Sequence, residues 1–251
     1  MRIALFVTCL VDLFRPVVGH ATVKLLEQSG ATVVIPRGQT CCGQPAYNNG
    51  DRDSARLLAR RVIDEFEGVD YVVVPSGSCG GMIKCHYPDL LAGDEQYAEK
   101  ARQLAARCYE LTRFLVEVAD IQITNVVFNE QVTYHDSCSC LRELNIKSEP
   151  RQLLHAVKSL QLNEMEATEE CCGFGGTFCV KYEELSINMV NNKVNHIEQS
   201  GANVVLAADM GCLMNIAGRI KRRGIDVRIY HIAEVLADMV QDNGIGGDSA
   251  Q

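Results

Sequence analysis

The stretch Cys41-Cys42-Gly43-Gln44-Pro45 is matched in the second half of the chain by Cys171-Cys172-Gly173-Phe174-Gly175. One cysteine precedes each stretch and another follows it, namely Cys9 and Cys79 in the first half and Cys138 and Cys212 in the second. The gaps are 32 and 37 residues in the first half, and 33 and 40 residues in the second. Scattered core cysteines would not be expected to keep such matched spacing. The sequence therefore predicts two duplicated halves.

The repeat suggests a division of the 251-residue chain into three parts. We assign residues 1–125 to the first half and residues 126–240 to the second, with the boundary near residues 120–131. The remaining residues, 241–251, are polar and rich in glycine, which is typical of a flexible tail.

Short β-branched runs in both halves are typical of buried parallel strands. They are Ile3–Val7, Thr32–Ile35 and Tyr71–Val74 in the first half, and Val132–His135, Val204–Ala207 and Val227–Tyr230 in the second. Helices are expected between them, near Pro150–Ser159, Tyr182–Gln199 and His231–Val240, and also around Cys108. This alternation predicts an α/β fold of two pseudo-repeated βαβ halves, each with a parallel sheet.

The composition excludes several classes of protein. Lys and Arg total 24 against 32 for Asp and Glu, and the net charge of −8 argues against a nucleic-acid or anionic-membrane binder. No run of about 18 uncharged apolar residues is present, so no transmembrane helix is expected. The early apolar run Ile3–Val11 is followed by Asp12 and Arg15 without a small-residue cleavage site. We therefore expect a cytoplasmic protein.

Twelve cysteines are the feature of the composition that points to function. Thiols stay reduced in the cytoplasm, and adjacent cysteines have Cα atoms only ~3.8 Å apart, too close for ordinary disulfide geometry. The pairs Cys41-Cys42 and Cys171-Cys172 are therefore better suited to metal binding or redox chemistry than to a disulfide framework.

The repeated cysteines are expected to converge at the carboxyl ends of the strands. Cys9 and Cys79 each follow a predicted strand, as do Cys138 and Cys212. Loops from several strands of a parallel sheet meet at that edge, which is where ligands bind. The glycine after each adjacent pair can adopt the positive φ that brings backbone close to a bulky group. Each half should thus offer four thiolates to one site built around its Cys-Cys-Gly motif, which we call the CCG site.

Four thiolates suit either an iron–sulfur cluster or a tetrahedral zinc ion. The C-x₂-C knuckle typical of structural zinc is absent, and adjacent cysteines can reach different irons of one cluster, so we favour clusters. Zinc, and buried or redox-active thiols, stay as alternatives. Four cysteines have no partner in the repeat and are interpreted as buried thiols, with the last two held in reserve as a fifth ligand: Cys85, Cys108, Cys140 and Cys179.

Other motifs carry less information. Gly77-Ser-Cys79-Gly-Gly81 is similar to a nucleophile elbow, but its repeat mate loses the trailing glycines, which disfavours a hydrolase. No dinucleotide fingerprint or P-loop is present. His135 is interpreted as a hydrogen-bonded histidine at a strand end, with tuning of a cluster as the alternative. No catalytic residue is assigned, and we expect the substrate to bind elsewhere.

Several blocks spread over nearly the whole chain resemble one family. They are Phe6-Val-Thr-Cys-Leu-Val-Asp12, Cys41-Cys-Gly-Gln-Pro-Ala-Tyr47, Pro75-Ser-Gly-Ser-Cys79, Cys171-Cys-Gly-Phe-Gly-Gly-Thr-Phe178 and Gly211-Cys-Leu-Met-Asn-Ile216. The blocks resemble the cysteine-rich CCG family and, within it, the lactate-utilisation protein A group. The wider family includes heterodisulfide reductases and the glycolate oxidase iron–sulfur subunit.

The resemblance implies an iron–sulfur electron-transfer subunit that oxidises L-lactate to pyruvate together with companion iron–sulfur and small subunits. A glycolate oxidase-type subunit, a heterodisulfide reductase-like thiol/disulfide redox protein and a zinc-binding structural subunit are the alternatives. Met82 and Asn215 stand where the wider family has a last cysteine. The resemblance therefore implies an ordinary [4Fe-4S] cluster in each half, two in all, with zinc in one half as the alternative.

Overall fold

The structure is a computed structural model that describes residues 1–240 and 243–247. Two four-stranded parallel sheets form its framework. The first contains β1 (Arg2–Leu5), β2 (Thr32–Val34), β3 (Tyr71–Val74) and β4 (Cys108–Glu110), in the order β2-β1-β3-β4. The second contains β5 (Gln131–Tyr134), β6 (Gln161–Leu162), β7 (Val204–Ala207) and β8 (Arg228–His231), in the order β6-β5-β7-β8. The same strand order in both sheets confirms the duplicated α/β fold.

Helices connect the parallel strands in each half. The first half contains α1 (Cys9–Phe14), α2 (Pro16–Glu27), α3 (Gln44–Asn48), α4 (Arg52–Glu65), α5 (Gly77–Gly81), the π-helical turn η1 (Met82–His86), α6 (Tyr87–Leu90), α7 (Ala98–Arg107), α8 (Leu111–Arg113) and the π-helical turn η2 (Phe114–Val118). The second contains the π-helical turn η3 (Ser139–Glu143), α9 (Ser148–His155), α10 (Phe178–Lys181), α11 (Glu183–Gln199), α12 (Met210–Arg223) and α13 (Ile232–Leu236).

The registers of the two sheets are equivalent. Ile3 of β1 pairs with Tyr71 of β3, and Val132 of β5 pairs with Val204 of β7. All four residues lie in buried or half-buried apolar runs, because helices cover both faces of each sheet. The strands therefore lack the alternation of apolar and polar residues that is typical of a sheet with one face exposed to solvent. The carboxyl ends of the two central strands of each sheet therefore lie side by side.

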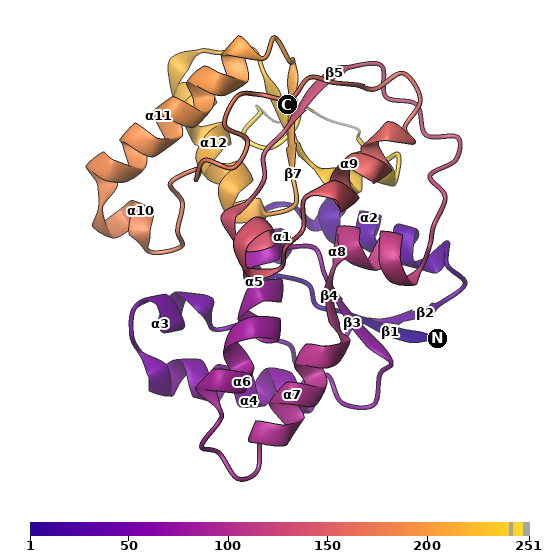
Figure 1. Ribbon diagram of the computed structural model, residues 1–251, viewed down its shortest axis with the longest axis vertical. Coiled ribbons are helices and arrows are strands. Elements are labelled where there is room, and N and C mark those ends of the chain that lie inside the picture. The colour runs from indigo at the N-terminus through magenta and orange to yellow at the C-terminus, as the bar shows by residue number, and fades with distance from the viewer. Residues whose placement is uncertain (241–242, 248–251) are drawn as a thin grey trace.

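The two halves share a hydrophobic core. One buried cluster joins Ile3 and Phe114 of the first half to Leu206 and Ile229 of the second. A second cluster covers the other face of the first sheet. Figure 1 shows α1 and α5 in the middle of the molecule, between the indigo-to-magenta first half and the orange-to-yellow second half. The halves consequently pack as one body, with the strand ends of both directed toward the junction.

The helix expected around Cys108 is wrong, because α7 ends at Arg107 and Cys108 begins the edge strand β4, which pairs with Val72 of β3. Part of the expected tail lies against the second sheet, where the backbone N–H of Ile245 donates to the carbonyl of Ile229 at 2.8 Å. The rest of it, 241–242 and 248–251, lies outside the described residues. Within those described, the helices are too short or too polar to cross a membrane.

Candidate metal centre

Strand order places the single cysteines of each half at a topological switch point. In the order β2-β1-β3-β4 the connections leave β1 and β3 in opposite directions, which opens a crevice beyond their carboxyl ends. Cys9 begins the helix that follows β1, and Cys79 lies in the helix that follows β3. Cys138 and Cys212 follow β5 and β7 in the same way. Two cysteines separated by about a third of the chain thus meet in each half.

A short polar side chain fixes the backbone at each of these four turns. Thr8 Oγ1 accepts from the N–H of Val11 at 3.3 Å, and its counterpart Ser137 Oγ accepts from Cys140 at 3.3 Å. Ser76 Oγ accepts from the N–H of Cys79 at 3.4 Å, and its counterpart Asp209 Oδ1 accepts from Gly211 at 3.1 Å. These caps satisfy backbone donors that the first helical turn leaves unpaired. They also hold each cysteine close to a helix N-terminus, where the dipole favours a thiolate.

The adjacent cysteines are held on glycine turns that no other residue fits well. Gly43 and Gly173 have φ of 84° and 81°, in the left-handed region. A Cβ at Gly173 would lie 2.8 Å from the carbonyl of Ser186. Each glycine donates its N–H to the sulfur two residues earlier, Cys41 or Cys171, at 3.4 Å. The turn therefore aims both a sulfur and an N–H donor into the crevice.

The structure brings the four predicted cysteines of the first half together. Cys41 receives hydrogen bonds from Cys42 and Cys9, and Cys42 is also hydrogen-bonded with Cys79. These bonds lower the pKa of Cys41 to about 2, whereas the bond with Cys41 raises the pKa of Cys9. All four line one cavity of about 220 Å³.

The second half repeats this arrangement. Cys171 is hydrogen-bonded with Cys138 and Cys172, and these contacts lower its pKa to about 2. Cys172 is in turn hydrogen-bonded with Cys212. Each half thus offers one sulfur that is readily a thiolate, surrounded by three more.

The donor set fits a thiophilic metal centre. Each half gathers four sulfur atoms, and both halves supply backbone N–H groups directed at sulfur, including that of Phe174 toward Cys172 at 3.5 Å. Thiolates are the ligands of iron–sulfur clusters and of structural zinc, and N–H donors to sulfur tune a cluster. All twelve cysteines are free thiols, so none of these sulfurs is engaged in a disulfide.

The four cysteines without a repeat partner lie in other surroundings. Cys108 is wholly buried in β4, and burial raises its pKa to about 12. Cys85 Sγ contacts the carbonyl of Glu143 at 3.5 Å. Cys140 is buried and packs so closely against Gly77 that a Cβ added to that glycine would lie 2.3 Å from the Cys140 sulfur. Cys179 Sγ lies 3.3 Å from the carbonyl of Gly176. The two cysteines held in reserve as a fifth ligand stay predictions.

Sequence reasoning undervalued His135. Its side chain is wholly buried, and neither ring nitrogen has a hydrogen-bond partner among the described residues, so the interpretation as a hydrogen-bonded histidine is wrong. One ring nitrogen and the sulfurs of Cys172 and Cys212 all lie within 4.8 Å of one another. Burial and the nearby Lys193 ammonium lower the pKa of His135 to about 3, so the imidazole is neutral. The feature of the sequence that could have indicated this role is the position of His135, three residues before Cys138.

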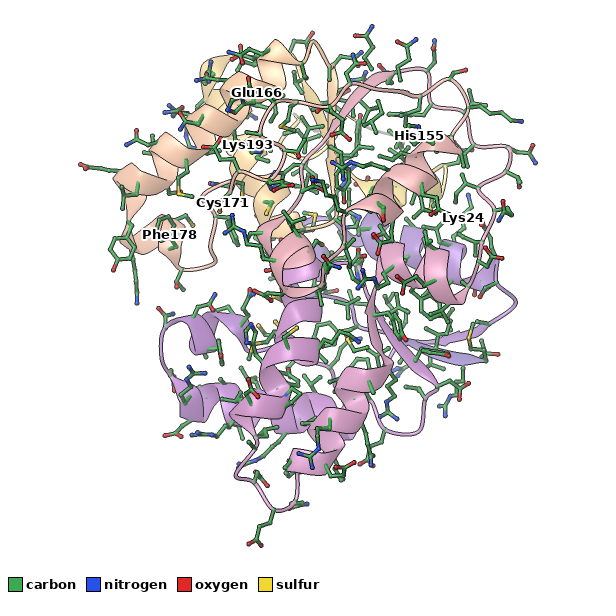
Figure 2. All side chains as sticks on the ribbon, viewed as in Figure 1. Lys24, His155, Glu166, Cys171, Phe178 and Lys193 are labelled. Atoms are coloured by element: carbon green, nitrogen blue, oxygen red, sulfur yellow. The ribbon has the colours of Figure 1, made fainter. Side chains whose placement is uncertain are left out.

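Lys193 is a second feature that the sequence did not reveal. Its side chain is buried, and Nζ donates to the carbonyls of Ala167 at 2.7 Å and Thr168 at 3.2 Å, in the loop that leads to Cys171. Burial lowers its pKa, opposed by the acidic Glu170 and the Cys172 thiol. Figure 2 labels Cys171 in the loop before α10 and Lys193 on α11. A buried cation of this kind favours negative charge on the neighbouring sulfurs.

The two sites are joined through a buried carboxylate. Asp209 caps α12 in the second half, and its Oδ2 also accepts from Ser76 Oγ at 3.0 Å and from the N–H of Ser78 at 2.9 Å in the first half. The N–H of Gly77 donates to the carbonyl of Ala208 at 3.3 Å. Asp209 also lines the cavity beside the first cysteine site. Equivalent turns of the two halves therefore contact each other at the junction.

Comparison with known families matches the repeat. The family described as "Cysteine-rich domain", CCG, matches residues 3–84 and again residues 132–217. The chain belongs to this cysteine-rich domain family, and one matched region lies within each of the two duplicated halves.

The relatives narrow this assignment to one group in the family. The chain is 48% identical over 236 residues to a Bacillus subtilis protein named lactate utilization protein A, covering 94% of this chain and 99% of the relative. It is 46% identical over 237 residues to lactate utilization protein A 2 of Bacillus cereus, covering 94% of this chain and 98% of that relative. The resemblance to the lactate utilization protein A group is confirmed.

The fold is also found among solved structures. A hypothetical protein from Helicobacter pylori aligns with a TM-score of 0.68 at 12% identity, covering 96% of this chain. The aligned region is 49% of that protein, so this chain spans about half of its length.

Proposed function

We propose that this chain is an iron–sulfur electron-transfer subunit of a system that oxidises L-lactate to pyruvate. The observation that carries the proposal is the convergence of Cys9, Cys41, Cys42 and Cys79 on one cavity, together with the mutual contacts of their equivalents in the second half. The names of the relatives, lactate utilization protein A, supply the substrate. Neither half carries a nucleotide fingerprint, which supports oxidation of lactate on a companion subunit.

The proposed role of each cysteine follows from its position. Cys41 and Cys171, the sulfurs with the lowest pKa, are the first to be thiolates and would begin metal binding. The other three sulfurs of each half would complete the set. A bound [4Fe-4S] cluster would supply one-electron acceptance and release, for which this chain would provide the ligands and the N–H donors.

The residues near sulfur would set the potential. The N–H groups of Gly43 and Gly173 donate toward sulfur, which stabilises a more reduced, more negative centre. Burial of Cys42 and Cys172 excludes water from the same side. Companion iron–sulfur and small subunits would exchange electrons with this chain.

Metal and sulfide analysis of the full chain tests the proposal. The protein is purified without oxygen, and iron, acid-labile sulfide and zinc are measured per chain. The expected result is iron and sulfide in equal amounts, sufficient for two clusters, with an absorption that bleaches on reduction. Stoichiometric zinc without acid-labile sulfide would instead support the structural zinc alternative and overturn the electron-transfer role.

The cavity beside the first site favours a second candidate, a thiol/disulfide redox protein. Besides four cysteines it is lined by the apolar Leu10, Phe174 and Met210, from both halves. A disulfide bound there would take up two electrons and two protons and leave as two thiols, with electrons from an external donor. Turnover of a small disulfide by the isolated chain with a reduced viologen dye would favour this candidate. No turnover, together with bound clusters, would favour the electron carrier.

A further inference from the structure

His135 occupies a position that is costly unless something outside the chain satisfies it. An imidazole N–H buried without a partner costs about 1–3 kcal/mol. Neither ring nitrogen of His135 has a hydrogen-bond partner in residues 1–240 and 243–247, and its side chain is fully covered. The carbonyl of Thr168 lies near the ring but outside hydrogen-bond geometry. The other buried histidine of this half, His231, accepts from the N–H of Ala233 and contacts the carbonyl of Pro75. Among the described residues, His135 is the buried histidine in which both ring nitrogens lack a partner, whereas His196 has one such nitrogen.

The surroundings of His135 have the dimensions of a metal site. Its ring nitrogen and the sulfurs of Cys172 and Cys212 lie within 4.8 Å of one another. Ligands bound to one metal atom, with metal–sulfur distances of about 2.3 Å and metal–nitrogen distances of about 2.0 Å, lie roughly 3.6 Å apart in a tetrahedron. Small side-chain movements would bring all three within reach of one zinc ion or, in a cluster, of neighbouring iron atoms.

The neighbouring cation of this half leaves the ring nitrogens of His135 available to a metal. Lys193 itself is engaged by the carbonyls of Ala167 and Thr168, so it does not compete for the imidazole nitrogens.

The first half, which the structure describes completely, has no such donor at the equivalent position. Phe6 lies three residues before Cys9, as His135 lies three residues before Cys138. Its ring is fully buried and packs against Phe66 with the centroids 5.5 Å apart. The same position in the repeat is thus apolar in one half and a nitrogen donor in the other.

We propose that His135 is a metal ligand, so that the second half holds a mixed imidazole–thiolate centre whereas the first half holds an all-thiolate one. The inference rests on the proposed binding of metal by the second cysteine site. Nitrogen and sulfur ligands together suit an iron atom of a cluster and also zinc, and the experiment separates these two metals.

The experiment uses the full chain labelled with ¹⁵N-histidine and purified without oxygen. Cys9→Ala removes a ligand from the first site, so that the remaining metal reports on the second. Pulsed electron paramagnetic resonance of the reduced iron centre should show a strongly coupled ¹⁵N nucleus, and X-ray absorption at the iron or zinc edge should show a nitrogen neighbour. Both signals should disappear when His135→Phe is added, a change that copies the residue of the first half. Cys172→Ala, which leaves the first site intact, serves as the matched control and should show no coupled nitrogen.

The outcomes separate this inference from the proposed function. Iron and sulfide in the second site without a coupled histidine nitrogen would overturn the inference and leave the electron-transfer role standing. Zinc with a nitrogen neighbour that His135→Phe abolishes would support the inference and would confine the electron-transfer role to the first half. A metal-free chain would overturn both. Should His135→Phe fail to fold, His135→Gln keeps a polar side chain of smaller size and must also abolish the imidazole coupling.

Discussion

Phe6 and His135 stand at the same place in the repeat, and they are followed by two further pairs of equivalent residues that are apolar in the first half and polar in the second. Ala55 and Ser186 are equivalent in the repeat, because the carbonyl of each lies beside the glycine of a cysteine turn. Val62 and Lys193 each lie seven residues further along the chain and are therefore equivalent as well. The apolar Val62 of the first half thus corresponds to the cationic Lys193 of the second.

A third difference follows the same trend. Met82 is buried in the first half, whereas its counterpart Asn215 donates from Nδ2 to the carbonyl of Cys172 at 2.8 Å. At these three positions the wall of the first site is therefore apolar and that of the second is polar. Both halves keep the same four-sulfur framework, whereas the residues at these three positions differ, so the two sets of sulfurs lie in different surroundings.

The largest effect should come from removing one sulfur in each half separately. Cys42→Ala should lose the metal of the first half and keep that of the second, and Cys172→Ala should do the reverse, each lowering total iron to about half. Spectra of the two variants should then differ, because the remaining centres have different walls. The measurement is the iron content per chain. The control is Cys108→Ala, which changes a cysteine without a repeat partner and should leave the iron content unchanged. Loss of all metal in either variant would show that the halves are not separate sites.

The next largest effect concerns two equivalent buried helix caps. Glu110 ends β4 and caps α8, and His231 ends β8 and caps α13. Burial raises the pKa of Glu110 from 4.5 to about 7 and lowers the pKa of His231 from 6.5 to about 4. Both side chains are thus held in their neutral forms, and they should give the metal-free chain opposite dependences on pH.

The signs follow from proton binding. Folded Glu110 keeps its proton between pH 4.5 and about 7 while the unfolded chain loses it, so its contribution to stability falls as pH rises through that window. Folded His231 stays unprotonated between about pH 4 and 6.5 while the unfolded chain binds a proton, so stability falls as pH falls. Each contribution is up to about 3 kcal/mol.

Denaturant unfolding across pH tests these two caps. Glu110→Gln should remove the loss of stability on the alkaline side, and His231→Asn should remove the loss on the acidic side, with Asn still able to cap. The measurement is the free energy of unfolding of each variant relative to the parent from pH 5 to 8. Parallel curves for parent and variants would contradict the assignment of these two groups.

Sequence reasoning found the framework of the molecule because that framework depends on local signals. β-branched runs specify the central strands, and the spacing of eight cysteines specifies which loops meet at their ends. The strand order places those loops at the switch point, which the alternation of strands and helices already implied.

What the sequence concealed depends on contacts across the fold. Cys108 begins an edge strand only because β3 offers it a partner, against the helical pattern of the preceding residues. Lys193 lies on a helix whose other faces are exposed, so only tertiary packing shows that it is buried. Asp209 is a helix cap by its sequence, and its link to Ser76 of the other half becomes visible only in the assembled structure.

A smaller effect should come from the buried cation of the second half. Lys193→Met removes a positive charge near the second cysteine site, which disfavours the reduced, more negative centre. We expect the potential of that centre to fall by on the order of 100 mV, from an interaction of about 2 kcal/mol at an effective dielectric constant near 20. A redox titration that resolves the two centres measures it. Lys158→Met, an exposed lysine of the same half, is the control and should shift neither potential. A shift confined to the first centre would refute the placement of this charge.

The smallest effect separates two different solutions to one structural need. The carbonyl of Cys42 accepts from the hydroxyl of Tyr87 at 2.8 Å, whereas the equivalent carbonyl of Cys172 accepts from Asn215 at 2.8 Å. Tyr87→Phe and Asn215→Ala each leave one carbonyl without this donor, which should lower the free energy of unfolding by about 1 kcal/mol. Asn215 is the more accessible of the two, so water can replace its hydrogen bond in part, and the loss in Asn215→Ala should be the smaller. Denaturant unfolding of the metal-free variants measures both. Equal losses would mean that the two turns are supported alike, and would contradict the expectation that water replaces part of the hydrogen bond of Asn215.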